Sequence, residues 1–380
     1  MDFRLNNTQK LFLQMVKDFA ENEVKDFAEE IDKQERYPEE IVKKMGEVGL
    51  LGITIPRKYC GANGDEIMYA LAGEELSKAC ATVGTILGAH TSLGTVPILN
   101  FGNDLQKDKY LKNLATGKSI GAFALTEPNA GTDAAAQQTT AVLDGDSYIL
   151  NGNKIFITNA GYADIYIVMA MTDKSAGVRG ISGFIVEANT IGFSIGKKEK
   201  KLGIRGSATS ELVFEDCRIP KENLLAKEGF GFKIAMHALD GGRVGVAAQA
   251  VGIAQGALDE CIKYVKERKQ FNKPLAFFQN TQFQIAEMAT KIEAARLLVL
   301  KAAFKKQNKI PFSKDAAMAK YYCSNVASEV CNKALQLFGG YGYMREYPIE
   351  RMLRDAKITE IYEGTSEVQK MVIAAHLLGK

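Results

Sequence analysis

The hydrophobic pattern of the chain changes its period twice, and this change restricts the folds that the chain can adopt. Over roughly the first 120 residues the apolar positions recur every three or four residues, as in 9–31, 38–48 and 104–114. From about Ala122 the pattern becomes one of short strands, and after Leu225 the helical period returns. The order of helices, sheet and helices predicts an α+β fold.

The β segment contains short strand-like runs with turn residues between them. These runs are 139–143, 147–150, 154–158, 165–171 and 181–187. Asp144-Gly145 and Asn151-Gly152 separate the first three runs, and such pairs are the commonest two-residue hairpin turns. The sequence therefore predicts an antiparallel sheet with two tight hairpins.

Long helices are expected in the last third of the chain. Thr281 to Gln284 has the pattern of a capping box, and the apolar residues after it fit a bundle helix that stops near Pro311. A second helix is expected to end at Gly339-Gly340, because glycine adopts the left-handed conformation that terminates helices. Thr365 is a good N-cap residue, so a last helix is expected to begin there.

Charge and composition disfavour several classes of function. The 48 basic and 45 acidic residues give a net charge of +3, so no overall field favours nucleic acid or an anionic membrane. The uncharged segment 79–103 contains glycines and Pro97, which favour a buried helix over a membrane span. No targeting peptide is evident. The six cysteines have neither C-x-x-C nor zinc-ligand spacing, so we expect no metal site, reduced thiols and a cytoplasmic location.

Two common nucleotide-binding motifs are absent. Gly229-Phe-Gly231 and Gly340-Tyr-Gly342 lack the third glycine of a dinucleotide-binding turn and follow no expected strand. The run 115–119 ends like a phosphate loop, but Lys112 occupies the position of its first glycine. A nicotinamide-binding fold and a P-loop are therefore disfavoured.

Three stretches carry groups that could act in a binding site. The loop 123–133 combines Pro, Asn and Gly with two threonines, so its backbone N–H groups could converge on one acceptor. The strand 154–158 ends in an aromatic residue and a hydroxyl. In IYEGTSEVQ (361–369), Glu363 lies in the loop that leads to the last helix. Taken singly, an irregular connection, an ordinary strand and an acid favoured by a helix N-terminus explain these stretches at least as well.

Five motifs nevertheless occur in a fixed order: 123–133, 154–160, Arg268-Lys-Gln270-Phe271, Gln336-Leu-Phe338-Gly339-Gly340 and IYEGTSEVQ. In this combination the sequence resembles the acyl-CoA dehydrogenase family over nearly all 380 residues, most closely its short-chain, butyryl-CoA type. The resemblance implies an N-terminal helical domain (1–121), a middle antiparallel β domain (122–225) and a C-terminal four-helix-bundle domain (226–380). It also implies FAD between the last two domains and a homotetramer.

The resemblance further implies which residues contact the cofactor. Those expected to contact the flavin are Phe123, Leu125, Thr126, Gly131, Thr132, Phe156 and Thr158, with the Thr158 hydroxyl donating to flavin N5. Those expected to reach the FAD of a neighbouring subunit are Arg268, Phe271, Gln336 and Gly340; Gln270, Gly339, Thr365 and Glu367 complete the cofactor set. An arginine suits a pyrophosphate because its planar fork bonds two oxygens at once, although an exposed cation at a helix end is the alternative for Arg268.

The same resemblance makes Glu363 the expected catalytic base. An acyl thioester has a weakly acidic α carbon and an unreactive β C–H, so dehydrogenation needs a base on one side and a hydride acceptor on the other. Some relatives carry the base at the position of Gly242, where glycine cannot act, and this points to straight-chain substrates. The residues expected to bind substrate are Thr132, Asp240, Arg243, Tyr362, Glu363 and Gly364, with a structural Asp240–Arg243 ion pair as the alternative.

A few positions depart from the family pattern or carry unassigned charge. Asn272 and Cys60 stand where glycine is common in relatives, and asparagine tolerates left-handed backbone better than most residues. The lysines at 197, 198, 200 and 201 could attract CoA phosphates, although a solvated run of charges is the more common case.

The expected function is FAD-dependent interconversion of a short-chain acyl-CoA and its trans-2-enoyl-CoA, with electrons exchanged with an electron-transferring flavoprotein. The direction stays open, because an enoyl-CoA reductase subunit of an electron-bifurcating complex, acting on acryloyl-, crotonyl- or aryl-substituted enoyl-CoA, fits the same motifs. An oxidase whose flavin reacts with oxygen is a further alternative. A non-catalytic scaffold would keep the core helices but would not need the base and the flavin contacts.

Overall fold

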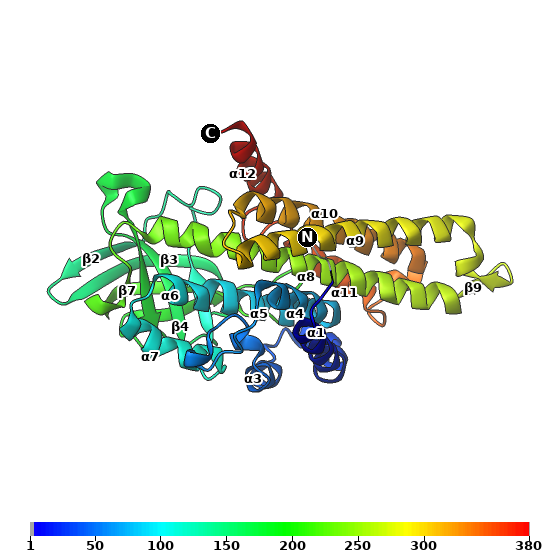
Figure 1. Cartoon of the computed structure of the whole chain (residues 1–380), viewed down its shortest axis with the longest axis horizontal. Helices are drawn as coiled ribbons and strands as arrows, with labels where there is room; N and C mark the ends of the chain where they lie inside the picture. Colours follow the sequence, from blue (N-terminus) through cyan, green and yellow to red (C-terminus); the bar gives the residue numbers. More distant parts are fainter. Residues whose placement is uncertain (1–3, 380) are drawn as a thin grey trace.

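The protein, described over residues 4–379 in a computed structural model, has helices at both ends of the chain and a sheet between them. In Figure 1 the sheet lies at the left, the N-terminal helices lie below the centre and the long C-terminal helices extend to the right. This arrangement confirms the predicted α+β fold.

The N-terminal region consists of short helices. These are α1 (Asn7–Phe19), α2 (Ala28–Gln34), α3 (Glu39–Glu47), α4 (Glu66–Ala79), α5 (Ala81–Gly88), α6 (Val96–Phe101) and α7 (Asp104–Ala115), with π turns η1 (Ala20–Val24) and η5 (Ala89–Thr95) and 3-10 turns η2 (Lys25–Phe27), η3 (Leu50–Gly52) and η4 (Arg57–Tyr59). The helix predicted over 9–31 is interrupted between α1 and α2, where Val24 leaves the helical region with φ of −121°.

The uncharged segment forms α5, η5 and α6 and is almost entirely buried, which confirms the predicted burial. None of the helices in 4–379 is long and apolar enough to cross a membrane. Close packing requires small residues here, because a Cβ on Gly94 would lie 2.6 Å from the backbone of Gly121. His90 joins the same two segments, since its Nδ1 accepts from the Gly121 N–H at 3.0 Å while its Nε2 lies 3.1 Å from the Leu114 carbonyl.

The sheet has the strand order β6-β7-β3-β2-β4-β5-β8, with β1 beside β4. Its strands are β1 (Gly121–Ala124), β2 (Thr140–Asp144), β3 (Ser147–Thr158), β4 (Ile165–Met171), β5 (Ile181–Glu187), β6 (Phe193–Lys198), β7 (Thr209–Pro220) and β8 (Leu224–Leu225), with the turns η6 (Lys174–Gly180) and η7 (Lys221–Asn223). Most pairs are antiparallel, as predicted, but β1 pairs with β4 in parallel.

One of the two predicted hairpins is wrong. The first hairpin forms one residue later than predicted, because Asp144 pairs with Ser147 and the turn residues are Gly145 and Asp146. At the second position β3 continues straight through Asn151 and Gly152. The pairing of β3 with β7 shifts register there, so Gly152 belongs to a β-bulge rather than a turn. Gly152 has φ of 141° and lies so close to Thr139 that a Cβ would be 2.7 Å from its Cα, which explains the glycine.

The C-terminal region is dominated by three long helices. Its elements are α8 (Gly231–Glu267), the short strands β9 (Lys269–Gln270) and β10 (Lys273–Pro274), η8 (Leu275–Phe277), α9 (Gln279–Gln307), α10 (Ser313–Phe338), η9 (Gly339–Tyr343), α11 (Ile349–Ile358) and α12 (Ser366–Leu378). Helix α8 packs against α10 and α9 and also against α4, so it joins the N-terminal and C-terminal helices.

The predicted helix ends were partly correct. Helix α10 ends at Gly339, whose φ is 63°, as predicted for a terminating glycine. The capping box at 281–284 is wrong, because α9 begins at Gln279 after the extended residue Phe278. Thr281 is buried inside the first turn instead of capping it.

Candidate active site

Glu363 lies in the short loop between α11 and α12, and its backbone is left-handed with φ of 56°. This conformation is uncommon for a residue with a Cβ. Gly364 follows with φ of 91°, and the Thr365 hydroxyl then accepts from the Val368 N–H at 3.3 Å to cap α12, as predicted. The loop therefore holds Glu363 in a conformation that must be stabilised by its surroundings.

Two fully buried side chains stabilise this loop. Lys320 Nζ on α10 donates to the Gly364 carbonyl at 2.7 Å. Gln369 Nε2 on α12 donates to the carbonyls of Gly364 at 2.8 Å and Glu363 at 3.2 Å. Within the part of the chain that the structure describes, no acceptor is paired with the Glu363 N–H. This N–H is thus available to a ligand.

A narrow cavity with a volume of about 30 Å³ lies beside the Glu363 carboxyl. Thr158 at the end of β3 lines the same cavity, together with Leu93 from η5 and Gly242 and Gly245 from α8. A Cβ on Gly242 would lie 3.4 Å from Glu363 Oε2 and 3.2 Å from Leu93 Cδ2. The structure therefore brings three predicted features to one cavity: Glu363 as the base, Thr158 as a flavin contact, and Gly242 at the position where some relatives carry their base.

Burial raises the pKa of the Glu363 carboxyl to about 7, and the nearby cations Lys320 and Arg243 oppose this rise. Burial also lowers the pKa of Lys320 to about 8, against the attraction of Glu363. Glu363 is half-buried and borders the cavity. A carboxyl with a pKa near 7 can both take and return a proton at neutral pH.

The end of the cavity beyond Gly245 is lined by polar side chains. Gln249 Nε2 donates to Thr85 Oγ1 at 2.7 Å, and Tyr362 donates its hydroxyl hydrogen bond to Gln249 Oε1. Tyr69 also lines the cavity, and its buried hydroxyl has no hydrogen-bond partner among residues 4–379. Tyr362, predicted to bind substrate, thus lines the same cavity as Glu363, within a network that the sequence did not indicate.

The predicted flavin loop is held by a buried ion pair. Lys154 Nζ contacts Glu127 Oε1 at 2.7 Å and donates to the Leu125 carbonyl and Gln137 Oε1, each at 3.0 Å. Glu127 also accepts from the Thr139 N–H at 3.0 Å. Burial lowers the pKa of Lys154 to about 8, whereas Lys154 holds the pKa of Glu127 below its usual value although burial alone would raise it. This pair fixes both ends of the loop.

Within and beside this loop the predicted flavin contacts differ in exposure. Phe123 and Leu125 are buried in the core, whereas Gly131 and Thr132 are exposed and Thr126 is half-buried. Phe123 and Leu125 can therefore contact a ligand mainly through their backbone atoms. No atom lies within 4 Å of a Cβ placed on Gly131, so the loop has open space at this point.

Phe156 is an exposed aromatic residue in uncommon backbone geometry, as is typical of a ligand-binding position. Its side chain is 60% exposed on a strand of the sheet, and its φ is 60°. The register of β3 against β7 shifts between Lys154 and Ile157, so Phe156 belongs to a second bulge. Exposure of a large aromatic ring in strained backbone, two residues before Thr158, fits a site that a planar ring would cover.

Six of the predicted cofactor residues lie far from this cavity within one chain, namely Arg268, Gln270, Phe271, Gln336, Gly339 and Gly340. The 26 residues of α8 from Gly242 to Arg268 correspond to about 40 Å at 1.5 Å per residue. Figure 1 shows β9, which follows Arg268, at the end of the molecule opposite the sheet. The Arg268 guanidinium lies 5.0 Å over the Tyr341 ring, which belongs to the turn η9. The other predicted residues of this region are exposed, namely Gln270 and Phe271 at β9, Gln336 in α10, and Gly339 and Gly340 in η9. Glu367 is exposed in the first turn of α12.

The ionic residues expected near CoA form their own contacts. Arg243 Nη1 contacts Asp240 Oδ1 at 2.5 Å, which is the structural alternative considered for this pair, and Ser313 Oγ donates to the same oxygen at 2.9 Å. The buried Nε of Arg243 has no partner within the described residues, so one donor is left over. Both readings of the pair therefore remain compatible with the geometry.

The lysine run and the two departures from the family pattern also have defined positions. Lys197 and Lys200 are exposed, as expected of a solvated run, whereas Lys201 is half-buried and donates to the Ser207 carbonyl at 2.7 Å. Cys60 and Asn272 are left-handed, with φ of 61° and 62°, which explains why glycine suits both positions. All six cysteines are unpaired, and only Cys60 is exposed.

Comparison with known proteins identifies the family. Models of the N-terminal, middle and C-terminal domains of acyl-CoA dehydrogenases match residues 6–118, 122–217 and 229–378. The chain belongs to the acyl-CoA dehydrogenase family. It is 59% identical to a short-chain specific acyl-CoA dehydrogenase of Clostridium acetobutylicum, over 99% of this chain and 100% of that protein. It is 52% identical to an acryloyl-CoA reductase (NADH) of Anaerotignum propionicum, over 100% of this chain and 96% of that protein.

A solved structure shows the same fold over the whole length. It is described as the electron transferring flavoprotein of Acidaminococcus fermentans, in work on flavin-based electron bifurcation. The matching chain is 55% identical, the match covers 100% of both chains, and the TM-score is 0.99. The resemblance that the five motifs indicated is therefore confirmed.

Sequence reasoning missed the residues that hold the acyl-CoA dehydrogenase site in place. Lys154, Glu127, Lys320 and Gln369 are all buried, and each bonds to a loop that carries a predicted site residue. Lys320 had a detectable signal, since it interrupts a face of α10 formed otherwise by small residues such as Ala316 and Cys323. A charged residue on a buried helix face requires a polar partner.

Proposed function

We propose that the chain interconverts a short-chain acyl-CoA and its trans-2-enoyl-CoA, with Glu363 as the only base. The observation that carries this proposal is the position of Glu363 and Thr158 on one narrow cavity, with Gly242 leaving space beside the Glu363 carboxyl. The names of relatives that are 52–59% identical over nearly the whole chain support the substrate class.

FAD is the cofactor of this family, and the residues present fit it. The exposed and strained Phe156 and the open space at Gly131 leave room for a ring system beside Thr158. We propose that Thr126, Thr132, Phe156 and Thr158 hold the flavin, with the Thr158 hydroxyl directed to flavin N5. The chemistry that FAD supplies when bound is acceptance of the hydride from the substrate β carbon.

The protein's own contribution begins with orientation of the thioester. The unpaired Glu363 N–H can donate to the thioester carbonyl oxygen, and this bond strengthens as negative charge develops on that oxygen. A single preorganised donor of this kind is typically worth about 10²–10³ in rate. Because Lys320 and Gln369 occupy the neighbouring carbonyls, the N–H direction is fixed before substrate binds.

Glu363 then removes the α proton. Its pKa of about 7 makes the carboxylate available at neutral pH and also allows it to return the proton when the reaction runs backwards. The cavity excludes bulk water from the enolate-like transition state, which strengthens the hydrogen bond to the carbonyl. Burial therefore has two effects: it raises the pKa of Glu363 and it strengthens the hydrogen bond that stabilises the negative charge on the thioester carbonyl oxygen.

The redox partner and the assembly belong to the same proposal. The likeness to a chain in an electron-transferring flavoprotein structure supports such a flavoprotein as the electron carrier. Arg268 and the exposed residues near it lie about 40 Å along α8 from the cavity, so they can reach FAD only in another copy of the chain. This supports the homotetramer that is typical of the family. Six unpaired cysteines support a cytoplasmic location.

The direction of the reaction follows from the electron donor rather than from the cavity. The similarity to an acryloyl-CoA reductase favours enoyl-CoA reduction within a bifurcating complex as the second candidate. Because the same base and the same acceptor serve both directions, crotonyl-CoA should reoxidise the reduced flavin of the wild-type protein in the absence of air. Failure of this back-reaction would remove the second candidate.

The decisive experiment is an anaerobic titration with butyryl-CoA. We expect the purified protein to be yellow and its flavin absorbance to bleach, whereas Glu363→Gln keeps FAD and loses bleaching. Glu215→Gln, which removes an exposed carboxylate from β7, is the control and should bleach as the wild type does. Activity of Glu363→Gln within tenfold of wild type would refute the assignment of the base. Rapid reoxidation of the bleached flavin in air would instead support an oxidase.

A further inference from the structure

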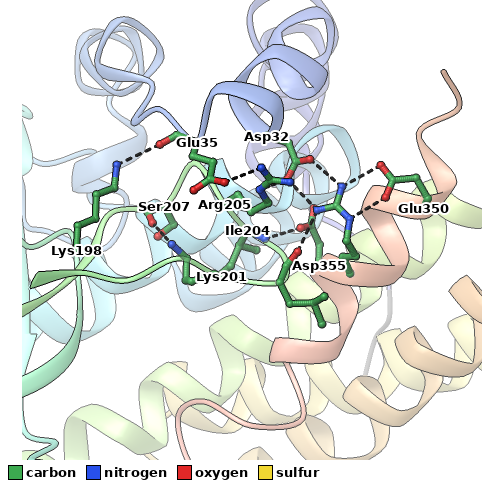
Figure 2. Close-up of polar contacts among 11 residues, drawn as sticks. Asp32, Glu35, Lys198, Lys201, Ile204, Arg205, Ser207, Glu350 and Asp355 are labelled. Carbon is green, nitrogen blue, oxygen red and sulfur yellow. Dashed lines mark hydrogen bonds and ion pairs between the residues drawn. The ribbon is translucent and has the colours of Figure 1, made fainter. Parts of the chain in front are cut away.

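Residues from three parts of the chain meet on the loop 199–208, which connects β6 to β7. Figure 2 shows this contact, with Asp32 and Glu35 from the N-terminal helices, Ile204 and Arg205 from the loop, and the helix α11. Arg205 Nη2 donates to Glu35 Oε1 at 2.6 Å, which ties the loop to the end of α2. The loop is therefore held from one side by the N-terminal helices.

From the other side the loop is held by α11. Arg354 donates through Nη1 and Nη2 to both oxygens of Asp32, at 3.0 and 2.7 Å, and through Nη1 to the Leu202 carbonyl at 3.1 Å. Its Nε and Nη2 also donate to Glu350 at 2.7 and 2.9 Å. The next residue, Asp355, is buried and accepts from the Ile204 N–H. One arginine thus contacts all three parts of the chain, and bidentate pairs of this kind have a fixed geometry.

The backbone of the loop also touches both neighbours directly. A Cβ on Gly203 would lie 2.4 Å from the carbonyl carbon and oxygen of Arg354, and a Cβ on Gly206 would lie 2.3 Å from Ile31 Cγ2. The loop therefore fills the space between α2 and α11 without room for one additional carbon. Any change in the position of α11 must move this loop, because packed interiors transmit displacement.

Both ends of this contact lead by short paths to the active site. The loop ends at Thr209, which is the β7 partner of Thr158 on β3. On the other side, Asp355 precedes Glu363 by eight residues, through the end of α11 and Thr359, whose carbonyl accepts from Ser324 on α10 at 2.7 Å. The contact therefore joins the segment that carries the base to the strand that carries the flavin contact.

We propose that Arg354 and Asp355 are positioning residues that fix the separation between the Glu363 carboxyl and Thr158 by clamping α11 onto the loop 199–208. This inference rests on the proposed function. In that function the substrate lies between Glu363, which takes the proton, and Thr158 beside the flavin, which takes the hydride. Reaction rates are sensitive to such a gap, and a misplacement of about 1 Å can cost about 10²-fold. The clamp does not touch the cavity, so it should affect turnover more than substrate binding.

The chain offers a closely matched control. Arg296 on α9 also contacts one carboxylate of the N-terminal helices, Glu74 at 2.8 Å, and one of its own helix, Glu293 at 2.6 Å. Its side chain is 23% exposed and that of Arg354 is 18% exposed. Within residues 4–379, however, Arg296 has no contact with the loop 199–208. The two arginines thus differ chiefly in the connection to the sheet.

The test compares Arg354→Gln with Arg296→Gln in the FAD-loaded protein. We expect the limiting rate of flavin reduction by butyryl-CoA to fall at least tenfold in Arg354→Gln, with KM within about threefold, and to stay near wild type in Arg296→Gln. Arg354→Lys should recover part of the rate. Hydrogen exchange provides a readout that needs no flavin: peptides 202–209 and 359–366 should exchange faster in Arg354→Gln only.

Gly203→Ala tests the same contact without changing any charge, and it is the second variant if Arg354→Gln does not fold. Its additional carbon should separate the loop from α11 and give the same loss of rate and the same pattern of exchange. Equal rates in Arg354→Gln, Gly203→Ala and Arg296→Gln would overturn the clamp while leaving the proposed function intact. No flavin reduction in the wild-type protein would instead refute the proposed function itself.

Discussion

The pH dependence of kcat/KM is the most direct consequence of the environment of Glu363. This parameter reports the ionisation of the enzyme before substrate binds. With a pKa of about 7, raised by burial, the base is mostly protonated below neutral pH. Activity requires the carboxylate, so kcat/KM should rise with pH through 7 and become constant above about pH 8.

The size of this change follows from the titration of one group. A carboxyl with a pKa of about 7 is about 9% ionised at pH 6 and about 91% at pH 8, so kcat/KM for butyryl-CoA should rise about tenfold over this interval. An unperturbed glutamate would be almost fully ionised at both values, and the profile would be flat. The measurement is a dye-linked assay at closely spaced pH values and constant ionic strength.

Two variants identify the group that titrates. Lys320→Met removes a cation that lowers the pKa of Glu363, so the midpoint should move above 7. Asp355→Asn tests another buried carboxyl, whose pKa burial raises to about 6, and should leave the midpoint unchanged even if the rate falls. A flat wild-type profile between pH 6 and 8 would refute the reasoning, as would a midpoint that moves downward in Lys320→Met.

Three further changes test other parts of the site. Lys154→Met should lower the free energy of unfolding by about 3–5 kcal/mol, because it leaves Glu127 buried without its cation. The double variant Lys154→Met with Glu127→Leu should recover most of this free energy, as measured by urea unfolding. Tyr69→Ala should raise the ratio of kcat/KM for hexanoyl-CoA over butyryl-CoA by at least about tenfold, because it removes a large side chain that lines the cavity and whose hydroxyl would lie 2.5 Å from a Cβ on Gly245. Tyr69→Phe should keep this ratio near that of the wild type. Arg268→Ala should lower the FAD content of the purified protein without changing the thermal unfolding of its β sheet. Full FAD occupancy in this variant would contradict the assignment of Arg268 as a cofactor-binding residue.

The features that the sequence predicted correctly are those that local chemistry determines. Thr365 caps α12 and Gly339 ends α10, because capping depends on a few adjacent residues. The strands at 165–171 and 181–187 were predicted with their observed ends, since their apolar runs are bounded by turn residues.

The errors arose where distant contacts override a local pattern. Asn151-Gly152 has the composition of a hairpin turn, but Gly152 is needed where the strand passes close to Thr139. Thr281 has the pattern of a cap, but its burial places it inside the helix. Lys320 bonds to the Gly364 carbonyl from α10, and nothing in the motif 361–369 indicates it. Gln369 is the last residue of that motif, but its bond to the Glu363 carbonyl depends on how α12 packs against the loop.

Helix α8 gives the protein a property that no single copy displays. It carries Gly242 beside the cavity and is followed by Arg268 at the far end of the molecule. In the proposed tetramer each copy would therefore complete a neighbour's cofactor site while its own base serves its own cavity. Two inactive variants, Glu363→Gln and Arg268→Ala, should therefore complement each other when unfolded and refolded together. Mixed oligomers would contain sites with an intact base and an intact arginine, whereas either variant refolded alone would contain none.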